Sequence, residues 1–316
     1  MSSGSKKVIF AALAGNTLIA VTKFVAAAVT GSSAMLSEGI HSLVDTGNQG
    51  LLLYGLARAK KPADEEFPFG HGKEIYFWSF VVAMLIFALG GGVSIYEGIK
   101  HLSHPQPMEN PLINYLVLGL ALLFEGGAWL FAFREFSRAK GKGSYVEAIA
   151  RAKDPAIFVV LFEDTAATLG LLVAFAGIVL SQMTGNLIYD GIASIAIGLI
   201  LVGTAIWLAY ETKGLLIGES ANRPVVEGIR ELVGAQPLVS HVNEVLTMHM
   251  GPDFILVNLS VDFEDKTTAD RIETVIGEMD RAIKERFPLV KRIFIEAEKR
   301  GAGSSDCAPV ADHPSE

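Results

Sequence analysis

The sequence has little cysteine and little charge. Its one cysteine, Cys307, excludes a disulfide framework and a cysteine-based metal site, so any bound metal must be held by His, Asp or Glu. Charged residues make up 19% of the 316 residues, whereas about 25% is usual in soluble domains, so a disordered or ordinary soluble protein is excluded. The 26 basic residues are outnumbered by 34 acidic ones and form no long run with aromatics, which argues against a nucleic-acid partner.

Apolar residues are abundant, at 51% of the chain with a mean hydropathy of +0.41. Because a membrane helix needs about 20 mainly apolar residues, six stretches are long enough to cross a bilayer. They are Val8–Thr30, Ala34–Leu56, Tyr76–Ile99, Leu112–Phe133, Ala156–Leu180 and Leu187–Ala209. The first follows Lys6 and Lys7 but is too long for a signal peptide, so we expect it to be retained.

The basic residues between these stretches indicate their orientation. Lys and Arg concentrate before the first span, between spans two and three, between four and five, and after the sixth. The three opposite loops carry one Lys between them, Lys100. The positive-inside rule therefore predicts a multi-pass protein with both termini in the cytoplasm.

Composition changes abruptly after Tyr210, where charge returns. The hydrophobic pattern then predicts helix, strand, strand, helix, strand, with a hairpin at Gly251 and a second helix that starts after Thr268. The predicted fold is six transmembrane helices followed by a small αββαβ, ferredoxin-like cytoplasmic domain. The predicted segments are a cytoplasmic N-terminal segment at 1–7, a membrane domain at 8–210, a linker at 211–222, the α+β domain at 223–298 and a disordered tail at 299–316.

Five ionisable residues lie where charge is costly. Glu38, His41 and Asp45 share one face of the second span, and Glu163 and Asp164 lie in the fifth. Each costs at least about 2.5–3.5 kcal/mol at the bilayer centre. A structural polar cluster around His41 would explain one acid, whereas four carboxylates without a buried Arg favour a divalent cation. Zinc suits His and Asp one turn apart, as would manganese, iron or cobalt.

Other charged residues have simpler interpretations. We expect Lys23 to snorkel to the interface or to neutralise a neighbouring acid. Glu97 and Glu125, near the ends of spans three and four, are expected at the interface, although they could line a path. Asp190 is predicted to cap the sixth helix.

Several motifs lie along residues 8–298. The HxxxD motif stands at His41 and Asp45, within SEGIHSLVDTGNQGLLL. Alone it is weak, because some membrane acyltransferases also carry it. It is joined here by FGHGK at 69–73, DTAATLG from Asp164 and DGIASIAIGLIL at 190–201. Together these motifs resemble those of the cation diffusion facilitator family of divalent-metal transporters. The TGNQGLLL continuation is most similar to the branch that contains the vertebrate mitochondrial zinc transporter.

The resemblance implies a transport site with two ligands from span two and two from span five. His41, Asp45 and Asp164 match three of these positions, but the fourth, one turn before Asp164, is Val160. Water, Glu38 or Glu163 could complete the shell. In the loop after span two, Asp64 and His71 match two positions of a second metal site, where the third is Phe67.

The family's small domain often binds zinc at a dimer interface. The matching positions here are Asn243, Asn258, Glu296 and Glu298, so we expect no strong zinc site there. The loop between spans four and five also lacks the histidine-rich run of many zinc transporters.

We expect a homodimer in the lipid bilayer of the bacterial inner membrane that exchanges cytoplasmic zinc for protons and is not an enzyme. Manganese, iron, cobalt or cadmium are other candidate cargoes. The alternatives are a non-transporting partner subunit or metal sensor of the same fold, and an acyltransferase that uses His41 as a base. The acyltransferase lacks support, because no Gly-rich or Arg-rich phosphate-binding motif adjoins the HxxxD sequence.

Overall fold

A computed structural model describes residues 3–105, 110–139 and 155–300. The chain divides into two compact units, a helical unit at 1–216 and an α+β unit at 217–316. Most of the loop predicted between spans four and five, and residues 301–316 of the predicted tail, lie outside the described residues.

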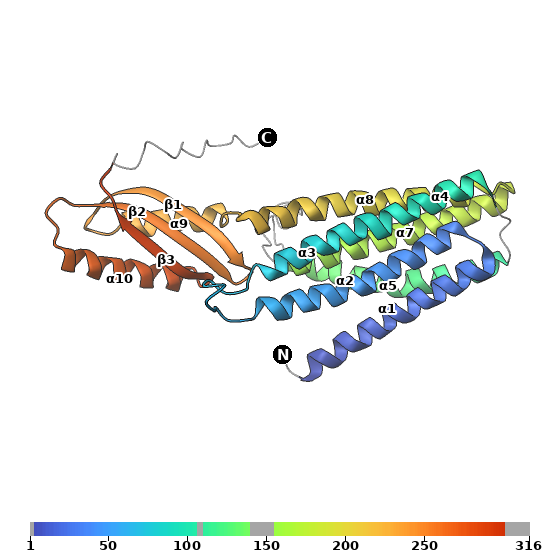
Figure 1. The fold of residues 1–316 in the computed structure, drawn as a ribbon, viewed down its shortest axis with the longest axis horizontal. Coiled ribbons are helices and arrows are strands. Elements are labelled where there is room, and N and C mark those ends of the chain that lie inside the picture. The colour runs from blue at the N-terminus through green and yellow to red at the C-terminus, as the bar shows by residue number, and fades with distance from the viewer. Residues whose placement is uncertain (1–2, 106–109, 140–154, 301–316) are drawn as a thin grey trace. The chain divides into compact units, whose positions relative to one another are not determined.

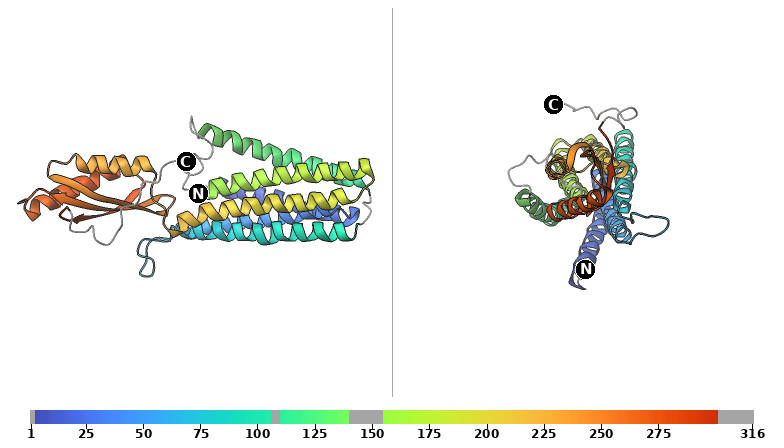
Figure 2. Two further views of the ribbon diagram at one scale, coloured as in Figure 1. Left: turned by 90° about the horizontal axis from the view of Figure 1, so that it is seen from above. Right: turned by 90° about the vertical axis from the view of Figure 1, so that its left-hand side faces the viewer.

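The helical unit is built of long helices that run side by side (Figures 1 and 2). Their bounds are α1 (Ser3–Thr30), α2 (Ser33–Ala59), α3 (Glu74–Leu85), η1 (Ile86–Gly92), α4 (Val93–Ser103), α5 (Pro111–Ala139), α7 (Pro155–Thr184) and α8 (Ile188–Ile217). Each of the six predicted apolar stretches lies within one helix or one run of consecutive helical segments, apart from Leu187, which immediately precedes α8. The unit is held together by one apolar core to which α2, α3, α7 and α8 all contribute.

Three described helical segments are long and apolar enough to cross a membrane: Glu74–Ser103, Val159–Thr184 and Ile188–Ile217. Shorter apolar helical stretches are Asn16–Thr30 and Leu112–Gly127. The predicted number of six spans is therefore supported in part, and α2 is the most polar of the long helices because it carries the HxxxD face.

The third predicted span is interrupted by the π-helical segment η1 between α3 and α4. Its sequence ends in Gly90, Gly91 and Gly92, whose backbone has no Cβ to restrain it. A π-helical turn inside an α-helix widens it locally and breaks the regular i to i−4 pattern. The wide segment lies where this helix contacts α8.

Four glycines bring that helix and α8 into backbone contact. A Cβ on Gly98 would lie 2.8 Å from the carbonyl oxygen of Gly191, and one on Gly198 would lie 2.9 Å from that of Gly91. Both pairs are seven residues apart on each helix and are matched in opposite order, so the helices are antiparallel. Small residues of this kind allow close helix packing in membranes.

The sixth helix is longer than predicted. Its apolar pattern continues through the buried residues Thr212 and Leu215, so α8 includes the first part of the predicted 211–222 linker, as far as Ile217. The first part of the predicted linker is therefore helical, although Glu211 and Lys213 bring charge into this part of α8.

The α+β unit contains α9 (Arg223–Gly234), β1 (Val239–Gly251), β2 (Phe254–Phe263), α10 (Ala269–Arg286) and β3 (Val290–Ala297). This confirms the predicted order of elements. β2 is the central strand, antiparallel to β1 and parallel to β3. Thr268 occupies the predicted N-cap position of α10, although its side chain makes no capping hydrogen bond.

Both helices of this unit contribute to one apolar core with the sheet. Val257 and Leu259 of β2 alternate with more exposed residues, and Ile229 of α9 and Met279 of α10 are fully buried in the same cluster. The unit is thus a two-layer α+β structure.

The glycine contact yields a stability prediction. Replacing Gly198 by Ala places a methyl group against a backbone carbonyl that cannot move aside, and we expect a loss of about 1–3 kcal/mol. Gly203→Ala is the matched control, because a Cβ at Gly203 on the same helix meets nothing within 4 Å. Thermal unfolding in detergent should show a lower melting temperature for Gly198→Ala alone. Equal melting of both variants would contradict the close contact.

Candidate metal and proton site

The polar face of α2 is buried as the helical spacing predicts. Glu38 and His41 are 0% and 1% exposed, and Nδ1 of His41 lies 3.4 Å from Oδ1 of Asp45, one turn further along. Neither ring nitrogen of His41 makes a hydrogen bond. The face continues to Asn48, which is also fully buried. A buried imidazole without hydrogen bonds beside a carboxylate has donor atoms available for a ligand.

Lys23 of α1 pairs with two carboxylates inside the unit. Its Nζ donates to Oε2 of Glu38 at 3.1 Å, to the Ser42 hydroxyl at 2.8 Å and to Oε1 of Glu125 at 3.1 Å. Of the two outcomes expected for Lys23, neutralisation of a neighbouring acid is confirmed and snorkelling is not, since the side chain is 0% exposed. Because Glu125 joins the cluster together with Lys23, the surplus of negative charge stays the same as the sequence predicts.

A cavity of about 250 Å³ opens beside this network, between α1, α2, α5 and α7. Four carboxylates line it: Asp45, Glu125, Glu163 and Asp164. The remaining lining residues are Asn16, Ile19, Ser42, Gln49, Phe124, Val160 and Ala167. Val160, the residue without a donor atom, thus lies in the wall of the same cavity as the two predicted aspartate ligands.

The two acids of α7 have different surroundings. Glu163 is 5% exposed and its Oε1 accepts a hydrogen bond of 2.8 Å from the Asn48 amide. Asp164 is partly exposed to the cavity. In the part of the chain that the structure describes, no three His, Cys, Asp or Glu side chains converge in a ready-made metal site. Metal binding would therefore require the side chains around the cavity to move closer together.

The predicted second pair, Asp64 and His71, does come together. Nε2 of His71 donates to Oδ2 of Asp64 at 2.9 Å, and the Phe67 amide donates to Oδ1 at 2.7 Å. The hydrogen bond from His71, helped by that from Phe67, holds the pKa of Asp64 below its ordinary value. The ring of Phe67 packs 4.5 Å from that of His71, so the third predicted position is filled by an aromatic contact.

Asp190 was predicted to cap its own helix, α8. It caps the start of α2 instead. Its carboxylate accepts hydrogen bonds from the Ser32 hydroxyl at 2.6 Å and from the Ser33 amide at 2.6 Å. The prediction was wrong because position in the first turn of α8 does not reveal which helix end the side chain faces. The bond instead ties the first turn of α8 to the N-terminus of α2, where a negative charge is favourable.

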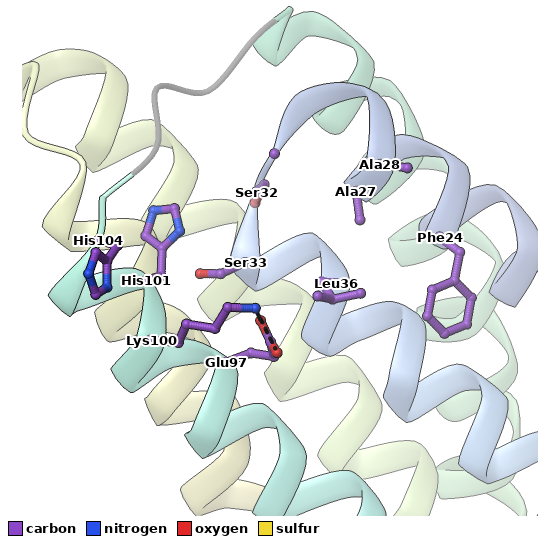
Figure 3. Close-up of a pocket in the computed structure, with 11 residues that line it drawn as sticks. Phe24, Ala27, Ala28, Ser32, Ser33, Leu36, Glu97, Lys100, His101 and His104 are labelled. Atoms are coloured by element: carbon purple, nitrogen blue, oxygen red, sulfur yellow. Dashed lines mark hydrogen bonds and ion pairs between the residues drawn. The ribbon is translucent and has the colours of Figure 1, made fainter.

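A second cavity, of about 740 Å³, lies near this end of α2 and α4 (Figure 3). Glu97, one of the two acids expected at the interface, lies in its wall and pairs with Lys100 at 3.3 Å. His101 and His104 extend from the same helix, and apolar residues of α1 and α2 form the opposite side. Glu97 is therefore already paired with a lysine. In the first cavity, Glu125 is the acid that is paired in this way.

In the α+β unit, polar residues at two of the four family-matched positions, Asn243 and Glu298, are linked to each other and to Ser260. The Asn243 amide donates to the Ser260 hydroxyl at 3.1 Å and to the backbone oxygen of Glu298 at 2.9 Å. The Ser260 hydroxyl in turn donates to the Glu298 carboxylate at 2.7 Å. These contacts cross the sheet from β1 to the residues after β3.

One residue of the site escaped the sequence analysis. Asn48 continues the spacing of Glu38, His41 and Asp45 along one helical face, so that signal was present. Glu125 was expected at the interface or, as the alternative, in the lining of a path, and it lines the cavity. Nothing in the local sequence of α5 indicates that Lys23, more than a hundred residues earlier, holds it there.

Apolar helices around buried charges define a multi-pass integral membrane protein. The family model of the cation efflux transmembrane domain matches residues 9–217. The chain therefore belongs to the cation efflux, or cation diffusion facilitator, family, which confirms the resemblance seen in its motifs.

Three relatives illustrate the range of the family. The mitochondrial proton-coupled zinc antiporter SLC30A9 of Mus musculus is 36% identical over 265 residues, which is 83% of this chain and 47% of the relative. Metal tolerance protein C4 of Arabidopsis thaliana is 30% identical over 95% of this chain and 64% of its own length. The cation-efflux pump FieF of Cronobacter sakazakii is 26% identical over 86% and 85%. The chain spans about half the length of the zinc antiporters that it matches.

The Lys23 network leads to a prediction. Lys23→Met leaves Glu38 and Glu125 without their cation, and removing one partner of a buried ion pair costs about 3–5 kcal/mol. We expect a lower melting temperature in detergent and partial recovery in the double variant Lys23→Met with Glu38→Gln, which removes the stranded charge. Additive losses in the double variant would contradict the pairing.

Proposed function

We propose that this protein is a secondary active transporter that exports a divalent cation, with zinc as the proposed cargo, from the cytoplasm in exchange for protons. The single observation that carries the proposal is the cavity among α1, α2, α5 and α7, into which four carboxylates face. The family membership supports a cation as cargo, and the names of relatives, a proton-coupled zinc antiporter and a cation-efflux pump, support zinc and protons.

Three residues are proposed as ligands of the transported ion. Asp45 and Asp164 face the cavity from α2 and α7, and the buried His41 lies 3.4 Å from Asp45 with both ring nitrogens available. One nitrogen and several carboxylate oxygens suit zinc, and also manganese, iron, cobalt or cadmium. The other two candidate ligands already have partners. Glu38 accepts a hydrogen bond from Lys23, and Glu163 accepts one from Asn48.

Proton exchange follows from the chemistry of the same ligands. A carboxylate or imidazole binds a metal only in its deprotonated form, so a proton and a metal compete for each ligand. Protonation from the far side of the membrane would release the ion there. Deprotonation on the cytoplasmic side would restore the binding site.

We further propose a homodimer of six-span subunits with both termini in the cytoplasm of a bacterial cell, located in its inner membrane. The loop charges of the sequence support the orientation. Asp64 and His71, already joined by a hydrogen bond on the loop after α2, are proposed as a weak accessory metal site on the same side. For the segments of the chain we propose the boundaries predicted from the sequence, except that α8 extends to Ile217.

The charge of the ligands gives the first functional prediction. Asp45→Asn or Asp164→Asn keeps the shape of the side chain but removes a negative ligand, so zinc uptake into proteoliposomes should fall at least about tenfold. Asp265→Asn, at a side chain 86% exposed in the other unit, serves as the control and should transport normally. Normal transport by both site variants would refute the assignment. A non-transporting partner subunit or sensor would show no flux even in the parent chain.

The second functional prediction concerns the proton gradient. Zinc flux should accelerate when the release side is made acidic, because protons there displace the metal from its ligands. The rate of zinc movement and the internal pH can be followed together with fluorescent indicators. Flux that does not respond to the gradient would indicate a uniporter or channel instead.

A further inference from the structure

Glu125 of α5 occupies an unusual position, because it belongs to two groups of residues at once. It lines the 250 Å³ cavity with Asp45, Glu163 and Asp164, and its Oε1 lies 3.1 Å from the Lys23 ammonium. Nothing in the HxxxD pattern or its partner positions on α7 includes this residue. The carboxylate thus already binds one cation at the edge of the cavity.

The cavity wall lacks a ligand atom one turn from Asp164. Val160 lies one turn before Asp164 on α7 and lines the cavity with an apolar side chain, 38% exposed. Among the described residues that line the cavity, Glu125 is the only carboxylate that does not belong to α2 or α7. It is therefore the acid that can approach a bound ion from a third helix.

The two partners of Lys23 differ in how easily they could change partner. Glu38 is 0% exposed and packed against Gly170, where an added Cβ would lie 2.5 Å from Oε1 of Glu38. Glu125 is 19% exposed and faces the open cavity. If Glu125 turned away, Lys23 would still keep Glu38 and the Ser42 hydroxyl. Glu125 can thus leave without stranding a buried cation.

We propose that Glu125 is a further ligand of the transported divalent cation and takes the place of the donor that Val160 lacks. In the metal-free state Lys23 holds its carboxylate. When the ion enters, Glu125 exchanges the ammonium for the metal, which draws α5 toward α2 and α7. The inference rests on the proposed transport function and adds a ligand from a third helix to it.

The test is zinc binding by calorimetry in detergent, together with zinc flux in proteoliposomes. Glu125→Gln keeps the size of the side chain and an oxygen that can accept a hydrogen bond from Lys23, but it loses the charge. We expect zinc affinity to fall by at least about tenfold, the lower end of what loss of an outer-shell partner costs. Affinity equal to that of the parent would overturn the proposal.

Glu97→Gln is the matched control. Glu97 is also 19% exposed and also pairs with a lysine, but it lies in the other cavity. It should bind zinc as the parent does. An equal fall in both variants would mean that loss of any paired acid weakens binding, and it would overturn a specific role for Glu125.

A second substitution separates a ligand from a merely structural residue. Val160→Asp places a carboxylate in the same wall of the cavity, one turn from Asp164. We expect it to restore zinc affinity in the Glu125→Gln background, with coupling measured by a double-mutant cycle. A structural tether between α1 and α5 would not be restored by a change on α7, so absence of rescue would count against the proposal.

Failure of the variant to fold and inactivity of the parent chain need separate interpretation. If Glu125→Gln does not fold, Glu125→Asp replaces it, since it keeps the charge for Lys23 but draws the carboxylate back from the cavity, and parental affinity there would overturn the proposal. If the parent chain itself neither binds nor moves zinc, the transport function fails. If the parent does both and Glu125→Gln matches it, the inference about Glu125 alone fails.

Discussion

The structure of the helical unit depends on how carboxylates are neutralised away from water. An unpaired charge in an apolar environment is too costly to keep, so each buried acid needs a cation, a hydrogen-bond donor or a proton. The Lys23 ammonium donates hydrogen bonds to Glu38 and Glu125, and the Asn48 amide donates one to Glu163. Asp45 and Asp164 remain at the cavity, and Asp45 lies beside a histidine without hydrogen bonds. The site is thus the place where this compensation is left incomplete.

The unit combines a tightly packed part with a part that has space. The η1 and α4 segments meet α8 through Gly91, Gly98, Gly191 and Gly198, so close that backbone oxygens lie where side chains would be. The four helices around the cavity share the apolar core but also contribute polar and charged side chains to the cavity wall. Because packed helices resist small deformations, we expect the movement that the proposed transport requires to be carried by α1, α2, α5 and α7.

Periodic features of the sequence predicted structure well, and long-range partners did not follow from it. The hairpin of β1 and β2 was predicted because alternation and the turn at Gly251 are local signals. The shared face of Glu38, His41 and Asp45 followed from helical geometry alone. The partner of Glu125, the helix end capped by Asp190 and the true end of α8 depend on which helices are neighbours. No spacing within a single helix contains that information.

The negative charge of the proposed site also limits which species can take the place of the metal ion when it leaves. Among the described residues near it, five carboxylates (Glu38, Asp45, Glu125, Glu163 and Asp164) face one ammonium, that of Lys23. A divalent cation removes two negative charges from this group, and so do two protons. Exchange of one ion for two protons therefore leaves the total charge within the apolar helices unchanged in both states. A site that released the metal without taking up protons would have to keep two more uncompensated negative charges away from water, which is the state that the low dielectric penalises most.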